Sequence, residues 1–219
     1  MNKILVSFAL ALLLSACNSD SNPETPTSSD SKAKTDTSVA ALLDTAKPDV
    51  VNINTETANA QIAVADFAGN LKAKLMEAMQ SSGPMKALSV CNHKVPAITA
   101  HLADVYGKQL SRVSLKYRNS NNRPDDWQRT ILEDFEARKA LGEDANKMVY
   151  AEIVTKDNKR QFRFMQAIVT EDRCLICHGK NISPKLKKRI TKLYPNDQAV
   201  DYEQGDIRGA FVVVNNLAD

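Results

Sequence analysis

Cysteine and histidine are scarce in this chain of 219 residues, which contains four of the first and three of the second. Long hydrophobic runs are scarcer still. Beyond residue 14, no apolar run reaches the roughly 20 residues that a membrane-spanning helix needs, so we do not expect the chain to signal across a membrane by itself. No internal repeat is visible, and the net charge of +3 is too small to indicate a class of partner.

A short apolar run at the N-terminus has the pattern of an export signal. Lys3 supplies its positive end, residues 4–14 are apolar apart from one serine, and two small residues precede Cys17. The run is too short to span a bilayer as a stable helix. Residues 1–16 are therefore predicted to be a signal peptide.

The tetrapeptide Leu14-Ser15-Ala16-Cys17 resembles the lipobox of bacterial lipoproteins, in which the cysteine becomes the acylated first residue. The alternative is an ordinary secretory signal with a stray cysteine. Asn18 after the cysteine resembles sorting to the outer membrane of Gram-negative bacteria. We expect a lipid anchor on Cys17 that holds the protein on the periplasmic side of that membrane, a compartment that excludes nucleic acid as a partner. Residues 17–38, rich in Ser, Thr, Asp, Asn and Pro, are predicted to be a disordered tether, and residues 39–219 a single domain.

The strongest chemical signal is the segment Arg-Cys-Leu-Ile-Cys-His-Gly at residues 173–179. Two cysteines three apart, followed at once by histidine, form the attachment motif of a c-type haem. Cys174 and Cys177 can add as thioethers to the two vinyl groups of one porphyrin edge, and their short span places His178 to ligate the iron. A thioredoxin-like redox pair would need a βαβ context, and a zinc site would need a second pair of ligands. The motif predicts one covalent haem, which is generally attached outside the cytoplasm, in agreement with the export signal.

The cysteine that remains is Cys91. If Cys17 carries lipid and the two motif cysteines carry haem, no disulfide can form within the chain. Cys91 lies in the middle of an apolar helical stripe formed by Leu88, Cys91, Val95, Ile98, Leu102 and Val105. A free cysteine in such a stripe is usually a small buried hydrophobe, so its own context leaves its role open.

The N-terminal half of the domain is helical by pattern, from residue 39 to residue 105, with breaks at Pro48 and Gly83-Pro84. Residues 60–80 carry an apolar stripe, and Met76 and Met79 within them are assigned to the core, although their spacing alone would also allow haem ligation.

In the helix after Gly83-Pro84, Pro96 predicts a bend near Asn92 that could open room for a cofactor. His93 is rotated about 200° from Cys91 about the helix axis, so it is expected to point elsewhere, and His101 flanks the stripe.

After Gly107 the pattern changes to that of strands. Val113, Leu115 and Tyr117 alternate with polar residues and predict a half-buried strand. Asp125 and Gln128 have the spacing of a capping box, which predicts a helix that ends near Gly142. Further strands are predicted at residues 148–155 and 160–170, joined by a two-residue turn at Asp157-Asn158, and at residues 207–215. The order predicts an α+β fold, with long N-terminal helices before a small antiparallel sheet, rather than an all-helical cytochrome.

A run of basic residues without any acid follows the haem motif. Its members are Lys180, Lys185, Lys187, Lys188, Arg189 and Lys192. The simpler interpretation is a solvated basic face of a helix, and the functional one is a docking site for an acidic redox partner or an anionic surface.

Over residues 60–215 the chain resembles the PAS-like c-type haem domain family, formerly a domain of unknown function and first seen in a cyanobacterial haem protein. The matching segments are Ala87-Leu88-Ser89-Val90-Cys91, Leu115-Lys116-Tyr117-Arg118-Asn119 with Asn122 and Pro124, Phe162-Arg163-Phe164-Met165, the haem motif, Tyr194-Pro195, and Gly205-Asp206-Ile207-Arg208-Gly209-Ala210. The resemblance implies a PAS-like antiparallel sheet with haem against it and iron held by His178 and the thiolate of Cys91.

On this basis Arg118, Asn119 and Met165 are candidate surroundings of the haem, and Met165, His93 and His101 are the rival iron ligands. The function that the resemblance implies is a redox or ligand sensor, or a low-potential electron carrier, rather than an enzyme. The alternatives are a peroxidase-like or small-molecule-reducing haem enzyme, which would need an exchangeable position on the iron and an acid or base beside it, and a lipoprotein that uses haem only as a structural staple.

Overall fold

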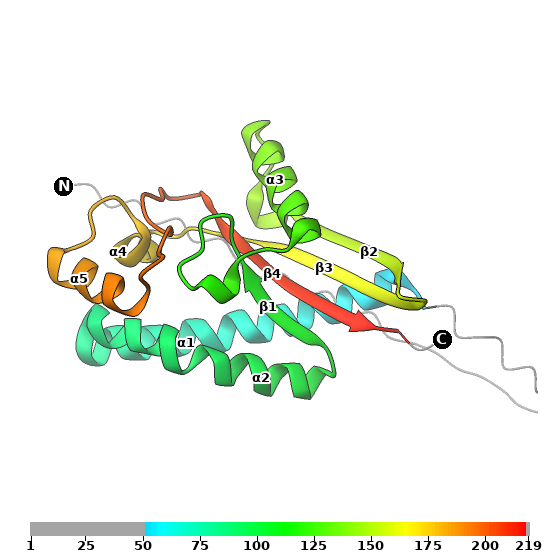
Figure 1. Ribbon diagram of the computed structural model, residues 1–219, viewed down its shortest axis with the longest axis horizontal. Coiled ribbons are helices and arrows are strands. Elements are labelled where there is room, and N and C mark those ends of the chain that lie inside the picture. The colour runs from blue at the N-terminus through cyan, green and yellow to red at the C-terminus, as the bar shows by residue number, and fades with distance from the viewer. Residues whose placement is uncertain (1–50, 218–219) are drawn as a thin grey trace, which may run out of the picture. The chain divides into compact units, whose positions relative to one another are not determined.

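The computed structural model describes residues 51–217 and shows a four-stranded sheet with helices against both faces (Figure 1). The predicted signal peptide, Cys17, the predicted tether and residues 39–50 lie outside the described residues. No helix within residues 51–217 has the length and apolar character that crossing a membrane requires. The predicted α+β class is confirmed.

Two helices precede the sheet. The first, α1 (Ile53–His93), is capped by the side chain of Asn52 and bends at Gly83, whose φ of 71° and ψ of −169° suit glycine alone. The break predicted at Gly83-Pro84 is therefore confirmed as a kink. The second, α2 (Val95–Tyr106), begins after Lys94 with a proline in its first turn and ends at Gly107. Where one bent helix was predicted across Pro96, the structure has two, because proline is better accommodated in a first turn than in a helix interior.

The sheet is antiparallel throughout, with the strand order β1-β4-β3-β2. Strands β2 (Val149–Lys156) and β3 (Lys159–Val169) form the predicted hairpin, and both turn residues have positive φ. The last strand, β4 (Ile207–Asn216), lies between β1 and β3, as the order requires.

The first strand is displaced from its predicted position. It was expected to run through Tyr117, but β1 spans Gln109–Val113. At Ser114 the backbone leaves the ladder: its N–H donates to the carbonyl of Asn122 at 3.1 Å, and its hydroxyl donates to the carbonyl of Arg208 at 2.8 Å. The alternating residues beyond Val113 therefore form a loop rather than a strand.

Each face of the sheet has its own core. Phe67 of α1 packs with Phe162, Phe164 and Val213 on one face. On the other face, α3 (Asp126–Ala140) contributes Phe135 to a second core. The predicted capping box is present at the start of α3. Both cores use residues of β3 and β4, since neighbouring residues of a strand point to opposite faces of the sheet. Both faces of these two strands are therefore apolar.

The remaining elements are short. Three are 3-10 turns: η1 (Ser120–Asn122), η2 (Ala145–Lys147) and η3 (Asp172–Cys174). After η3 come α4 (Leu175–His178) and the basic helix α5 (Pro184–Leu193). Figure 1 shows α4 and α5 near the kinked end of α1, at the end of the sheet where β4 begins.

Candidate functional site

The Cys-x-x-Cys-His motif forms one tight helical turn just after β3. Cys174 ends η3, and its Sγ lies 3.4 Å from the backbone N–H of Glu171. Cys177 and His178 follow in α4, and all three side chains are half-buried. A Cβ on Gly179 would lie 2.7 Å from the carbonyl oxygen of Leu175, so only glycine allows the chain to leave the turn along this path.

The imidazole of His178 is held in one orientation. Its Nδ1 lies 2.9 Å from the carbonyl oxygen of Ala199, and because a carbonyl only accepts, Nδ1 carries the proton and Nε2 keeps its lone pair. Burial, together with the positive charges of Arg208, Arg118 and Arg112, lowers the pKa of His178 well below its ordinary value. The ring is therefore neutral at physiological pH, which is the form that ligates a metal.

Arg118 ties the motif to the segment that precedes β4. Its Nη2 donates to the carbonyl of Cys177 at 2.7 Å and to that of Ala199 at 2.9 Å. Its Nε lies 3.1 Å from Oδ1 of Asp197, and the two side chains are only 9% and 10% exposed. The same Oδ1 accepts from the N–H of Ala199 at 2.9 Å. Arg118 and His178 thus share one carbonyl acceptor, so the arginine helps to fix the position of the imidazole.

The third cysteine of the described residues, Cys91, belongs to α1. It lies on α1 beyond the kink, and Leu88, one turn earlier, packs with Cys177 and with Leu186 of α5. Burial raises the pKa of the Cys91 thiol, and three nearby arginines oppose that rise. Burial also raises the pKa of Cys177, and a negative charge on Cys91 raises it further. The packing of Leu88 and these electrostatic effects place Cys91 in the surroundings of Cys177 and His178.

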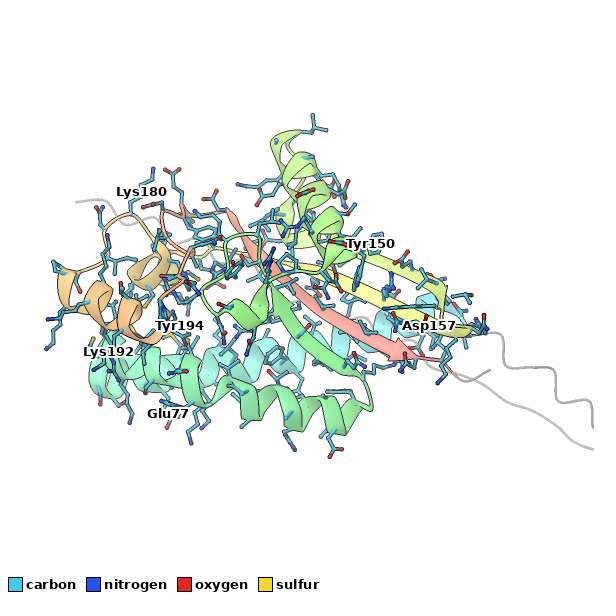
Figure 2. All side chains as sticks on the ribbon, viewed as in Figure 1. Glu77, Tyr150, Asp157, Lys180, Lys192 and Tyr194 are labelled. Carbon is cyan, nitrogen blue, oxygen red and sulfur yellow. The ribbon has the colours of Figure 1, made fainter. Side chains whose placement is uncertain are left out.

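Tyr194 belongs to the same place. It is buried in the cluster with Leu88, Leu186 and Ile190. Its pKa is raised mainly by burial and next by a negative charge on Cys91. Figure 2 shows Tyr194 at the end of the molecule that also carries Lys180 and Lys192. From the sequence, Tyr194 was noted only as part of the Tyr194-Pro195 segment that matches the haem domain family, with no role in the site.

Other predicted residues lie elsewhere. Asn119 uses its side chain to cap its own turn, accepting from the N–H of Asn121 at 3.1 Å. Met165 is fully buried in the core on the α3 face, because the pleat turns it away from the face that α1 covers. The structure therefore does not bring Met165 to the motif. His93 and His101 are both exposed.

The two methionines assigned to the core have different places. Met79 packs against Ala78, Ala87 and Val90, as predicted. Met76 instead lines a hollow of about 600 Å³ beside the residues that lead into Cys174, with its sulfur 3.6 Å from Nη1 of Arg173. Its assignment to the core was wrong. The helical pattern shows which residues share a face of α1, but not which part of that face is covered by other elements.

Two arginines join the site although the sequence did not single them out. Arg112 is on β1, with its guanidinium 5.7 Å from the ring centroid of Phe67 on the face that α1 covers. Arg208 is at the start of β4, and its Nη1 donates to the hydroxyl of Ser114 at 3.0 Å. Both contribute to the electrostatic field at Cys91 and His178. In the sequence, Arg112 is one of the polar residues that alternate with apolar ones in the predicted strand, and nothing in that pattern assigns it to a site.

A family model described as Tll0287-like matches residues 29–215. The chain belongs to the Tll0287-like family. A solved structure, the crystal structure of the cyanobacterial heme-protein Tll0287, is 22% identical to this Tll0287-like chain, with a TM-score of 0.58. The match covers 75% of this chain and 96% of the cyanobacterial one, so it shows that the two share a fold. A search of curated proteins finds no match.

Proposed function

We propose that the chain is a haem protein, with one c-type haem attached covalently through Cys174 and Cys177. Membership of the Tll0287-like family and the likeness to a cyanobacterial heme-protein support haem binding. The main support comes from His178, which directly follows the free cysteines 174 and 177. Its imidazole is neutral and is anchored through Nδ1 to the carbonyl of Ala199, so Nε2 is available to bind iron. The donor set fits a haem, because the two thiols could bond to its two vinyl groups and the imidazole in the same turn could bind its iron.

In this proposal His178 and Cys91 would hold the iron of the haem, which would supply one-electron chemistry when bound. The other residues position these ligands. Ala199 holds Nδ1–H and so fixes the ring orientation of His178, and Arg118 holds Ala199 and Cys177 together. Cys91 is half-buried, and its burial raises the pKa of the thiol, while the nearby arginines oppose that rise. An anionic ligand stabilises ferric iron, which gives a low potential.

The function proposed for this site is that of a redox or ligand sensor, or of a low-potential electron carrier, on the periplasmic side of a bacterial outer membrane. The sequence of residues 14–18 supports anchoring by a lipid on Cys17. A haem enzyme would need an acid or base beside the iron. His93 and His101, the imidazoles other than His178, are both exposed on the helices, which favours a sensor or carrier.

The test is the visible and near-infrared spectrum of the holoprotein and of Cys91→Ala. We expect low-spin iron with a thiolate-to-iron charge-transfer band in the parent, and loss of that band with an opened coordination position in Cys91→Ala. His93→Ala and His101→Ala are matched controls that should leave the spectrum unchanged. If Cys91→Ala keeps the low-spin spectrum and potential of the parent, the Cys91 assignment is wrong. Absence of covalent haem in the parent would refute the proposal as a whole.

A further inference from the structure

The candidate site carries more positive charge than the described residues neutralise. Arg112, Arg118 and Arg208 all act on Cys91 and on His178. Asp197 pairs with Arg118, but no carboxylate within residues 51–217 forms an ion pair with Arg112 or Arg208. Two half-buried guanidinium groups are thus left without a carboxylate counter-ion among the described residues.

The hydrogen bonding of Arg208 is incomplete as well. Its Nη1 donates to Ser114 and, at 3.3 Å, to the carbonyl of Lys116, but its Nε is buried and has no partner among the described residues. A buried charged donor without a partner is costly, and native structures seldom keep one. Arg112 makes no side-chain hydrogen bond within the described part of the chain and lies over the ring of Phe67 instead. Both side chains are therefore set for acceptors that the polypeptide does not supply.

The chemistry of a ferric c-type haem matches this surplus. A thiolate ligand cancels the single positive charge of a ferric porphyrin, so the haem leaves the negative charges of its two propionates. The three guanidiniums and Asp197 leave two positive charges. Guanidinium and carboxylate pair through two parallel hydrogen bonds, which is the geometry that a free Nε and Nη edge offers. Without the haem, a thiolate at Cys91 would carry one negative charge and would balance only one of the two unpaired arginines.

We infer that Arg112 and Arg208 form the carboxylate-binding part of the site and receive the two propionates of the haem. This inference rests on the proposed function, since it requires a haem. It adds a residue set that the sequence did not indicate: β1 and the start of β4 supply the cations, while α1 and α4 supply the iron ligands. Arg118 is kept for positioning, because its Nε already donates to Asp197 and its Nη2 to the carbonyls of Cys177 and Ala199.

The experiment is redox-induced infrared difference spectroscopy of holoprotein whose haem is labelled with ¹³C at the propionate carboxyl carbons, through labelled 5-aminolevulinate. The label isolates propionate bands from those of protein carboxylates. Arg112→Gln and Arg208→Gln should each shift the ¹³C-sensitive bands. Arg189→Gln is the matched control, because Arg189 is exposed on α5 and forms no ion pair within the described residues, so its loss should leave the bands in place.

A second measurement needs no variant. In the parent, pairing with arginine should keep the labelled propionates ionised at about pH 4, where an ordinary carboxyl group is close to half protonated. The inference is overturned if the labelled carboxyls of the parent titrate like ordinary ones, or if both Gln variants carry haem with unshifted bands. A parent without covalent haem, detected by intact mass, would instead refute the proposed function.

Discussion

Arg118 is the residue whose contacts are most concentrated at the site. One guanidinium reaches Asp197 and the carbonyls of Cys177 and Ala199, and so connects three parts of the chain that are far apart in sequence. A buried charge of this kind is stable only while its partners are present. The arginine therefore holds both the local fold and the orientation of His178.

Replacing Arg118 by Ala is expected to lower the free energy of unfolding by about 3–5 kcal/mol, because Asp197 is then left buried without its counter-ion. The measurement is denaturant unfolding of the holoprotein. Lys74→Ala, which breaks the exposed pair of Lys74 with Glu77 on α1, is the control and should cost no more than about 1 kcal/mol. If Arg118→Ala with Asp197→Ala is as unstable as the sum of the two single changes, the pair is not coupled.

At the scale of residues, the sequence indicates a haem motif because attachment chemistry needs a short, contiguous spacing, and covalent attachment stays a prediction. It could not have predicted that Arg118 meets Asp197, 79 residues away, or that Ala199 accepts from His178. Those contacts depend on a loop that closes over the motif, and they involve a backbone carbonyl, which no residue type identifies. The place of Arg112 and Arg208 in the site could not be predicted for the same reason.

Among the elements, α1 shows how a sequence pattern succeeds. A glycine followed by a proline predicted a break, and the structure has a kink at Gly83 that directs the rest of α1 toward α4 and α5. By contrast, the prediction for β1 was wrong at its C-terminal end. The alternation from Val113 to Tyr117 is typical of a strand, but a strand needs a partner, and the Val113–Ala210 pair is the last one between β1 and β4.

The kink gives a prediction with an internal control. Gly83→Ala should lower the free energy of unfolding by about 1–3 kcal/mol, because a φ of 71° with a ψ of −169° is strained for any residue with a Cβ. Gly69→Ala, in the same helix at an exposed position with open space around its Cα, should raise it by about 0.5–1 kcal/mol. Thermal unfolding of both variants distinguishes them, and a stabilised Gly83→Ala would contradict the kinked geometry.

The basic helix α5 is proposed to dock an acidic redox partner. Leu186 and Ile190 face the core beside Cys177, while five basic side chains are exposed and form no ion pair within the described residues: Lys185, Lys187, Lys188, Arg189 and Lys192. Lys180 differs, because it pairs with Glu203. The charge is therefore carried by the helix that packs beside Cys177, one of the two cysteines proposed to hold the haem, where it could steer an acidic partner.

Reversing the charge of Lys187 and Lys188 to Glu should slow electron exchange with an acidic protein acceptor, and added salt should slow the exchange of the parent, since exposed charges are screened over about 8 Å at physiological ionic strength. Stopped-flow kinetics measures both effects. Lys156→Glu is the control: it is exposed on the β2–β3 hairpin next to Asp157, at the opposite end of the molecule from Lys192 (Figure 2). Rates that are independent of salt and of the double reversal would leave α5 as a solvated face only.

For the whole molecule, every residue assigned to the proposed site lies between Cys91 and Arg208. These residues belong to one compact unit, which includes all of the described residues 51–217. The fold class and the order of its elements could be predicted because periodicity and turn residues are local. That α1 and α2 cover one face of the sheet and α3 the other could not, because long-range packing decides it.

The last prediction concerns the N-terminal segment and Cys17. If residues 1–16 are an export signal and Cys17 is acylated, the mature protein should begin at Cys17, carry the mass of the acyl groups and of one haem, and fractionate with membranes. Cys17→Ser should release the protein from the membrane fraction with its haem spectrum unchanged. A version that lacks residues 1–38 and is directed to the periplasm by an unrelated cleavable signal should also be soluble and carry haem. Intact mass decides the question, and a soluble mature form without acyl mass would show that the segment is an ordinary secretory signal.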